Sequence, residues 1–245
     1  MRFLIVALIL IFLSGCAPNG KAMNRAEVHF MLGVSYLQAD EPSQALNEFL
    51  QAEEIEPDDA PLQAGLGQAY FAKKSYTEAE KHYLQALKLD KDNPKYENNL
   101  AALYMETKRW DDAIRYFHKA ASNLLFSQPE VAWTGYGYAY FMKGDYLAAI
   151  SAYKKALDQN WRYPQAYVRR GEAFDALGKP GKAIADYEQA LKLYPNYSLA
   201  HYNLAITGMK LRKVDMAINH FSKVVDLAPD SNLANQAKSY LLVLK

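Results

Sequence analysis

Residues 164–197 constrain the fold of this chain more than any other stretch. They contain two amphipathic patterns separated by a Gly-Lys-Pro-Gly turn at 178–181, in the sequence PQAYVRRGEAFDALGKPGKAIADYEQALKLYPNY. Small residues at Gly171, Ala183 and Ala190 allow two helices to approach closely, and aromatic residues fill the gaps between them. Such a hairpin cannot bury its apolar face alone. The segment therefore predicts a helical pair that needs copies of itself as neighbours.

Copies of this segment follow one another with a 34-residue period from Ala26 onward, which is the period and signature of the tetratricopeptide repeat. The six predicted repeats are 26–59, 60–93, 94–129, 130–163, 164–197 and 198–231. Residues 232–245 form a predicted capping helix, since their apolar residues lie at helical spacing on one face. The predicted fold class is all-α: an α-solenoid, a right-handed superhelix of six helix-turn-helix repeats with a C-terminal capping helix.

The spacing lengthens by two residues between repeats three and four, at the sequence SNLLFSQP of 122–129. A solenoid accommodates such an insertion as a local change of superhelical angle or as a bulging loop. The formal net charge of the 245-residue chain is +1, and Lys/Arg runs are absent from the sequence. This near-neutral composition argues against nucleic acid as a partner and against a polybasic membrane patch.

The N-terminus has the form of a bacterial export signal. Arg2 precedes an apolar run at residues 3–13, which is shorter than the roughly 20 residues of a membrane-spanning helix. The sequence Leu-Ser-Gly-Cys then ends at Cys16, the only cysteine of the chain, and it resembles a lipobox. We therefore predict a lipoprotein signal peptide at 1–15, acylation (palmitate) of Cys16 and a lipidated tether at 16–25.

The resemblance to bacterial lipoproteins also indicates where the protein is sorted. In that family an aspartate directly after the cysteine often signals retention at the inner membrane, and here the residue is Ala17. The resemblance thus implies a lipid-anchored protein of the outer membrane that faces the periplasm. Multiple acyl chains would hold it stably, because one chain alone binds marginally.

The sequence contains no persuasive catalytic constellation. His29 and His201 take the place of Trp133 and Tyr167 in their repeats, which favours a packing role. The other histidines, at 82, 118 and 220, lie on second helices, where we expect surface or inter-repeat positions. Metal-binding and phosphate-binding motifs are also missing. We expect no enzyme activity, no catalytic residue, no metal, no cofactor and no small-molecule substrate.

A concave groove is the strongest candidate for a binding site. The first helices of stacked repeats line that side, and their outward residues are unusually apolar for a solvated face. The alternatives are that these are ordinary packing residues, or that the register is shifted by one. The predicted groove residues are Phe30, Val34, Leu37, Gln68, Phe71, Asn98, Ala102, Met105, Thr134, Tyr138, Phe141, Val168, Glu172, Tyr202, Ile206 and Met209. Phe30, Val34 and Leu37 form one stripe that an amphipathic helix or an extended peptide could cover.

Residues 98–157 resemble the type IV pilus pilotin lipoproteins of the PilF, PilW and Tgl type. The likeness lies in the pair Asn98-Asn99, in the inserted segment and in the sequence QPEVA at 128–132. Cys16, the chain length and the number of repeats agree with that family, although its late repeats are expected to be more degenerate than repeats five and six here. The resemblance implies binding of the secretin subunit and promotion of its outer-membrane localisation and multimer assembly.

Two other functions remain open at this point. An adaptor lipoprotein of the periplasm, recruiting cell-wall hydrolases or proteases, would share the signal peptide and the repeats. Affinity capture from envelope extract separates it from a pilotin by the partner that is recovered. An enzyme with an unrecognised site would require a turnover that is lost when a named residue is replaced.

Overall fold

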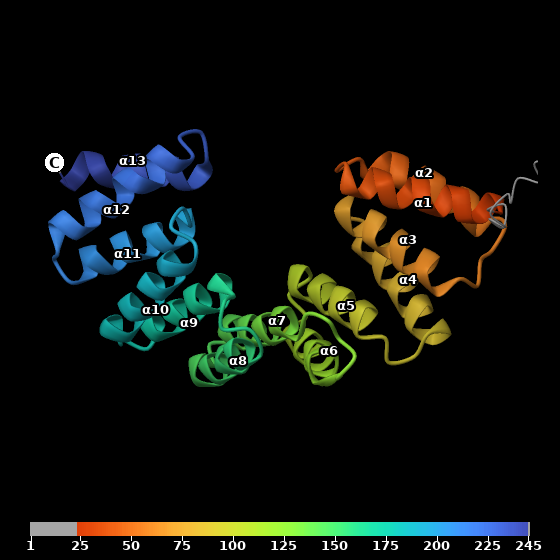
Figure 1. Ribbon diagram of the computed structural model, residues 1–245, viewed down its shortest axis with the longest axis horizontal. Helices are drawn as coiled ribbons and strands as arrows, with labels where there is room; N and C mark the ends of the chain where they lie inside the picture. The colour runs from red at the N-terminus through yellow and green to blue at the C-terminus, as the bar shows by residue number, and fades with distance from the viewer. Residues whose placement is uncertain (1–23, 245) are drawn as a thin grey trace, which may run out of the picture.

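The computed structural model describes residues 24–244, which form thirteen α-helices joined by short turns (Figure 1). The helices are α1 (Arg25–Gln38), α2 (Pro42–Glu53), α3 (Ala60–Ala72), α4 (Tyr76–Leu89), α5 (Pro94–Glu106), α6 (Trp110–Ser122), α7 (Pro129–Met142), α8 (Tyr146–Gln159), α9 (Pro164–Ala176), α10 (Pro180–Leu193), α11 (Ser198–Lys210), α12 (Val214–Leu227) and α13 (Asn232–Leu244). The predicted all-α solenoid of six repeats and a capping helix is confirmed. The predicted signal peptide and Cys16 lie outside the described residues. Within these residues, no helix combines the length and apolar character that a membrane crossing requires.

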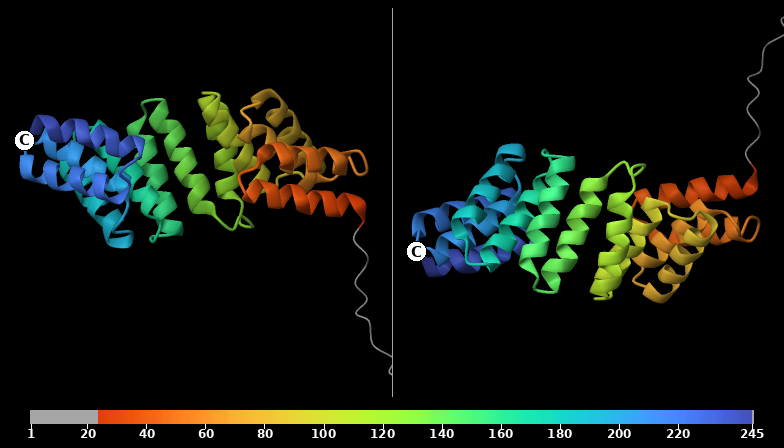
Figure 2. Two further views of the ribbon diagram at one scale, coloured as in Figure 1. Left: turned by 90° about the horizontal axis from the view of Figure 1, so that it is seen from above. Right: turned by 90° about the horizontal axis from the view of Figure 1, so that it is seen from below.

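The six hairpins stack side by side into an arc. Each odd-numbered helix contacts the next odd-numbered helix as well as its own partner, whereas consecutive even-numbered helices of the described chain make no such contact. The odd-numbered helices therefore lie at the shorter radius, and α5 and α7 face the inside of the arc in Figure 1. Figure 2 shows from two opposite sides that the hairpins follow one another without a break. The first helices of the repeats thus line the concave side.

Close approach of the two helices in a hairpin depends on small residues opposite aromatic rings. A Cβ atom added to Gly67 would lie 2.6 Å from the ring of Tyr83, and one added to Gly171 would lie 2.5 Å from the ring of Tyr187. Contacts this short do not occur, so only glycine allows the ring to sit against the helix backbone at these positions. The same ring position is buried in every repeat, by the residues Phe49, Tyr83, Phe117, Tyr153, Tyr187 and Phe221.

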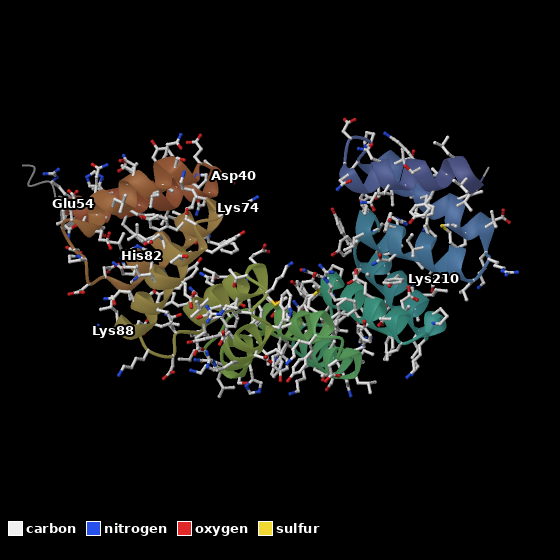
Figure 3. The ribbon with its side chains drawn as sticks, turned by 180° about the vertical axis from the view of Figure 1, so that it is seen from behind. Asp40, Glu54, Lys74, His82, Lys88 and Lys210 are labelled. Carbon is white, nitrogen blue, oxygen red and sulfur yellow. The ribbon has the colours of Figure 1, made fainter. Side chains whose placement is uncertain are left out.

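The turn inside each hairpin has one backbone geometry. The second residue after the first helix has a φ angle between 56° and 82° in all six repeats, at Asp40, Lys74, Lys108, Gly144, Gly178 and Arg212. In the second repeat, the N–H of Lys74 donates to the carbonyl of Phe71 and the N–H of Ser75 donates to that of Tyr70, both at 2.9 Å. This is the Schellman arrangement, which satisfies the last carbonyls of a helix. Asp40 and Lys74 lie at neighbouring turns in Figure 3.

The inserted segment forms a loop between α6 and α7. Leu124 and Leu125 are 100% and 89% exposed, while Phe126 is 8% exposed and anchors the loop in the core. The side-chain amide of Asn123 donates to the carbonyl of Asp92 at 3.0 Å, which ties this loop to the preceding inter-repeat turn. Of the two accommodations expected for the insertion, the structure shows the bulging loop, and α7 begins one residue before the predicted start of repeat four.

Polar side-chain pairs join the two helices of several hairpins. Nδ1 of His29 lies 2.7 Å from Oε2 of Glu48, and Nδ1 of His201 lies 2.9 Å from Nδ1 of His220. His82 bonds Gln63 at 2.7 Å and stacks on Tyr70 within its hairpin, and its Nδ1 lies 3.9 Å from Oε1 of Glu53 in the preceding repeat. It is buried, so the inter-repeat position expected for it is confirmed and the surface position is wrong. Figure 3 labels His82 on α4. The histidines that close a hairpin contribute to packing.

Replacing Lys74 by glycine tests the strain in the turn. A residue with a Cβ atom costs about 1–2 kcal/mol in the left-handed region, while glycine loses about 0.5–1 kcal/mol more conformational entropy on folding. We therefore expect Lys74→Gly to raise the free energy of unfolding by about 0.5–1 kcal/mol, measured by urea unfolding. The matched control is Gly144→Ala at the equivalent turn. This substitution should lower the free energy of unfolding, because alanine has a Cβ atom in the left-handed region. A destabilised Lys74→Gly protein would contradict the argument.

The histidine pair predicts a loss of stability at mildly acidic pH. Burial lowers the pKa of His201 and of His220, and the neighbouring His201 lowers that of His220 further. The unfolded chain therefore binds more protons than the folded chain in the window between the lowered values and the ordinary pKa of about 6.5. Stability is fully present above that window and falls as the pH drops through it.

Thermal unfolding followed from about pH 7.5 to about pH 5.5 checks this expectation. The control variant is His220→Gln, which keeps a side-chain amide able to donate to His201 but removes one titrating group. Its midpoint should depend less steeply on pH than that of the unmodified protein. Identical slopes for both proteins would show that the pair does not set the pH dependence.

Candidate partner-binding groove

A cavity of about 400 Å³ opens on the concave side of the first three repeats. Phe30, Val34 and Leu37 of α1 line it together with Gln68 of α3, so four of the predicted groove residues meet there. The ring of Phe30 also packs on that of Phe49, with the centroids 5.9 Å apart. The cavity therefore has an apolar wall built by one helical stripe on α1.

Small residues and a polar rim shape the rest of this cavity. Ala64 and Gly65 of α3 line this cavity without long side chains that would fill it. The ring of Phe49 lies close to Gly65, since an added Cβ atom there would be 2.9 Å from it. Lys95 and Asn99 of α5 contribute polar groups at its edge. Such a concave surface suits the apolar face of a helix or a peptide side chain, with polar groups to fix its orientation.

A second cavity, of about 210 Å³, lies two repeats further along the concave side, in repeats three to five. Asn98 and Ala102 of α5 line it with Thr134 and Tyr138 of α7, which brings four more predicted residues together. Thr134 is buried, and its hydroxyl donates to the carbonyl of Glu130 at 2.7 Å. The side chain of Thr134 is therefore fixed by its own helix. Its predicted exposure in the groove is wrong, although it contributes to the cavity wall.

Three predicted residues lie at the hairpin turns and line neither cavity. Phe71 contacts the ring of Tyr76 at 5.9 Å between centroids, and Phe141 contacts that of Tyr146 at 5.2 Å. Met105 is partly buried against the core of the central repeats. Phe71 and Phe141 thus join the two helices of their own hairpins.

The predicted groove is largely occupied by the protein itself in the last two repeats. Val168 is fully buried, which contradicts its assignment to an exposed groove. Both oxygens of Glu172 are used, by Arg169 at 2.9 Å and by Asn203 at 3.0 Å. Tyr202 donates to Gln236 of α13 at 2.9 Å. The capping helix and the internal polar pairs thus already contact the groove residues of this region.

Ile206 and Met209 are also covered by the capping helix. They are partly buried in one apolar cluster with Leu233, Tyr240 and Leu241 of α13. The ring of Tyr240 stacks on that of Phe221, with the centroids 5.0 Å apart. These residues follow the register predicted from the sequence, but the last helix covers them.

Several lining residues lie outside the predicted set. Lys95 and Asn99 line the first cavity, and Gln165 and Arg169 line the second. Within each pair the spacing is four residues, so the two side chains share a helix face. The sequence signal that could have found them is this second stripe, next to the one on which the prediction relied. Among the described residues, no group of three or more His, Cys, Asp or Glu side chains is arranged to hold a metal.

Arg169 stands at the wall of the second cavity. Its guanidinium lies 4.5 Å from the centroid of the Tyr138 ring and donates through Nη1 to Glu172. Burial lowers the pKa of Arg169, but the Glu172 carboxylate, together with the hydroxyls of Tyr138 and Tyr153, outweighs this effect and holds the pKa above its usual value. Arg169 therefore remains charged, with its charge compensated inside the protein.

Comparison with known proteins agrees with the repeat architecture. Models described as tetratricopeptide repeat match residues 26–59, 98–122, 164–197 and 199–231, and a TPR repeat model matches 67–108 and 137–178. The serine/threonine-protein phosphatase T of Trypanosoma brucei brucei is 35% identical over 102 residues, which are 42% of this chain and 21% of that protein. The small glutamine-rich tetratricopeptide repeat-containing protein 2 of Mycosarcoma maydis is 32% identical over 89 residues, covering 36% and 25% respectively. This chain spans a quarter or less of these two relatives.

Solved structures with the same fold cover most of the chain. The PilF structure of Pseudomonas aeruginosa has a TM-score of 0.74 at 19% identity, covering 88% of this chain and 97% of that one. PilW, described as a widely conserved type IV pilus biogenesis factor, has a TM-score of 0.79 at 17% identity, covering 89% and 100%. The Cut9–Hcn1 hetero-tetramer of the APC/C has a TM-score of 0.73 at 20% identity, covering 89% of this chain and 43% of that one. With repeat models matching well over half of its length, this chain belongs to the tetratricopeptide-repeat family.

Proposed function

We propose that this chain is a pilotin, a non-enzymatic protein that binds the type IV pilus secretin subunit and promotes its outer-membrane localisation and multimer assembly. In this proposal the protein is anchored to the outer membrane by lipid on Cys16 and faces the periplasm. A segment of the secretin, an amphipathic helix or a peptide, occupies the cavity next to α1. No catalytic group takes part.

The cavity lined by Phe30, Val34 and Leu37 is the observation that carries the proposal. Its apolar stripe is open, unlike the inner face of the last repeats, which α13 and internal polar pairs occupy. A concave apolar surface with a few polar groups beside it is typical of a binding site. Because α1 follows closely on Cys16 in the sequence, a lipid there would hold the cavity near the membrane.

The structural neighbours and the sequence resemblance support the choice of partner. PilF and PilW are matched over nearly their whole length, and one of them is described as a type IV pilus biogenesis factor. At 19% and 17% identity the likeness establishes the fold, so the partner and the pilus role rest on the resemblance of residues 98–157 and on the proposed lipid anchor. Loss of multimeric secretin from the outer membrane on deletion of the gene is the decisive expected result.

Polar substitutions on the apolar stripe test the binding surface. Val34→Gln combined with Leu37→Gln keeps helix-compatible side chains but removes apolar area from the cavity. Burying one such side chain contributes about 1.5–3 kcal/mol, so the affinity for the purified secretin subunit should fall about tenfold or more. Titration calorimetry measures the affinity, and circular dichroism checks that the fold is kept.

The matched control is Leu147→Gln on α8, at an exposed apolar position outside both cavities. It should leave secretin binding unchanged. Unaltered affinity in the double variant would remove the cavity from the proposal. Recovery of a cell-wall hydrolase or a protease, without secretin, in affinity capture from envelope extract would favour an adaptor lipoprotein instead.

Replacing Cys16 by alanine tests the anchor. Without the thiol no acyl chain can be attached, so metabolic labelling with palmitate should disappear and the protein should leave the membrane fraction. The secretin should then fail to reach the outer membrane although the repeats still bind it. A Cys16→Ala protein that still supports outer-membrane secretin multimers would show that the lipid is not required.

A further inference from the structure

The loop between α6 and α7 exposes two leucines that the fold itself does not use. Leu124 and Leu125 are 100% and 89% exposed, more than any other large apolar side chain of the described chain. The side-chain oxygen of Asn123 accepts from the N–H of Leu125 at 2.9 Å, and its amide donates to the carbonyl of Asp92 at 3.0 Å. Phe126 is buried behind them. A fixed loop thus holds both leucines outward, and such exposed apolar surface marks contact with another molecule or with a membrane.

This loop lies at the edge of the solenoid from which the proposed lipid tether leaves. Every first helix begins and every second helix ends at that edge, so the turns between repeats share it with the start of α1. Both views in Figure 2 place the start of α1 and this loop at the same side of the molecule. Asn24 follows Cys16 by eight residues, which span at most about 26–29 Å. A lipid on Cys16 would therefore keep the membrane close to this edge.

Two further turns between repeats expose aromatic side chains at the same edge. Trp161, between α8 and α9, is 57% exposed, and Tyr194, between α10 and α11, is 53% exposed. The guanidinium of Arg162 lies 4.8 Å from the centroid of the Trp161 ring. Tryptophan and tyrosine are enriched where a membrane meets water, because each has an apolar ring and one polar group. These two side chains suit the headgroup region of a bilayer.

The charges at this edge favour lipids without a net charge. A cavity of about 370 Å³ opens beside Leu125, and its lining includes two acidic and two basic residues, Asp90, Asp92, Lys91 and Lys95. A zwitterionic headgroup carries one phosphate and one ammonium group, so this lining offers a partner to each. Glu56 accepts from Asn24 at 2.8 Å and adds a negative charge next to the tether. Anionic lipids would be repelled there.

We propose that the loop at 123–128 contacts the outer-membrane bilayer, with its two leucines among the upper acyl chains and with Trp161 and Tyr194 at the headgroups. The inference rests on the proposed lipid anchor at Cys16 but not on the secretin as partner. A tether alone leaves the solenoid free to turn, whereas a tether and a loop together fix its orientation. The plane of the arc in Figure 1 then lies along the bilayer, so the concave side opens parallel to the membrane surface.

Quenching by brominated lipid tests the contact. The full-length acylated protein is reconstituted into vesicles of phosphatidylcholine and phosphatidylethanolamine, with or without bromine on the upper acyl-chain carbons. Leu125→Trp places a reporter on the loop, and we expect its emission to shift to the blue in vesicles and to be quenched by brominated lipid. The matched control is Leu147→Trp in the first turn of α8, at the opposite edge, where the leucine is 66% exposed. Its emission should be neither shifted nor quenched.

Both reporters are made in a Trp161→Phe background, since the native Trp161 should itself be quenched. That native residue then serves for a second variant, Leu124→Ser combined with Leu125→Ser. Loss of two apolar side chains from the bilayer should weaken the edge contact about tenfold or more, so quenching of Trp161 should largely disappear. The protein should still float with the vesicles through its acyl chains. Its thermal midpoint should not change, because both leucines are exposed.

A Leu125→Trp protein that floats with the vesicles but is neither shifted nor quenched would overturn the inference. A change of its emission seen only after addition of purified secretin subunit would do the same, because the loop would then be a protein contact. Protein that does not float at all would remove the lipid anchor and this inference with it.

The pilotin proposal and the membrane contact can fail separately. Secretin binding that depends on Val34 and Leu37, in a protein whose loop is not quenched, would leave the pilotin in place and remove the membrane contact. A quenched loop in a protein that does not bind secretin would support the membrane contact and remove the pilotin.

Discussion

The rest of this structure depends on one contact, in which an aromatic ring of the second helix packs directly against the backbone of the first helix at a small residue. An added Cβ atom at Gly137 would lie 2.6 Å from the ring of Tyr153, so the ring takes the space that a side chain would need. This brings the two helices of a hairpin together and leaves one flat apolar face for the next hairpin. Repetition of the same contact gives the regular arc, in which each repeat depends on its neighbours for stability.

Both cavities arise where the ring of one hairpin also meets a glycine of the next hairpin. The ring of Phe49 meets Gly33 of its own hairpin and Gly65 of the next one, and the ring of Phe117 likewise meets Gly135 of the next hairpin. The corresponding place carries Asn99, Arg169 and Asn203 in other repeats. Where glycine stands instead, the inner helix has no side chain to fill the groove, and a cavity opens beside it. Binding capacity thus comes from the same small residues that set the packing.

The fold could be predicted from the sequence because its signature is local. Each turn, small residue and ring recurs within one 34-residue unit, and the face of the first helix follows from helical spacing. The site could be predicted only in part, because exposure on that face depends on neighbouring units. The burial of Val168 depends on contacts between repeats, and the covering of Tyr202 and Ile206 depends on the direction of α13. The spacing of residues within one repeat predicts neither the contacts between repeats nor the direction of the last helix.

The inner face therefore divides into two halves with different chemistry. In the last repeats its polar groups already bond one another, as Glu172 does with Asn203 and Asp175 with Thr207, so a ligand would have to break existing bonds. In the first repeats an apolar stripe is open, and Asn98 has no partner in the described chain. Asn98 and Asn99 are consecutive on α5, about 100° apart around the helix, and line different cavities. The open part of the inner face therefore consists of two cavities on either side of α5, and a partner that fills both has to pass over this helix.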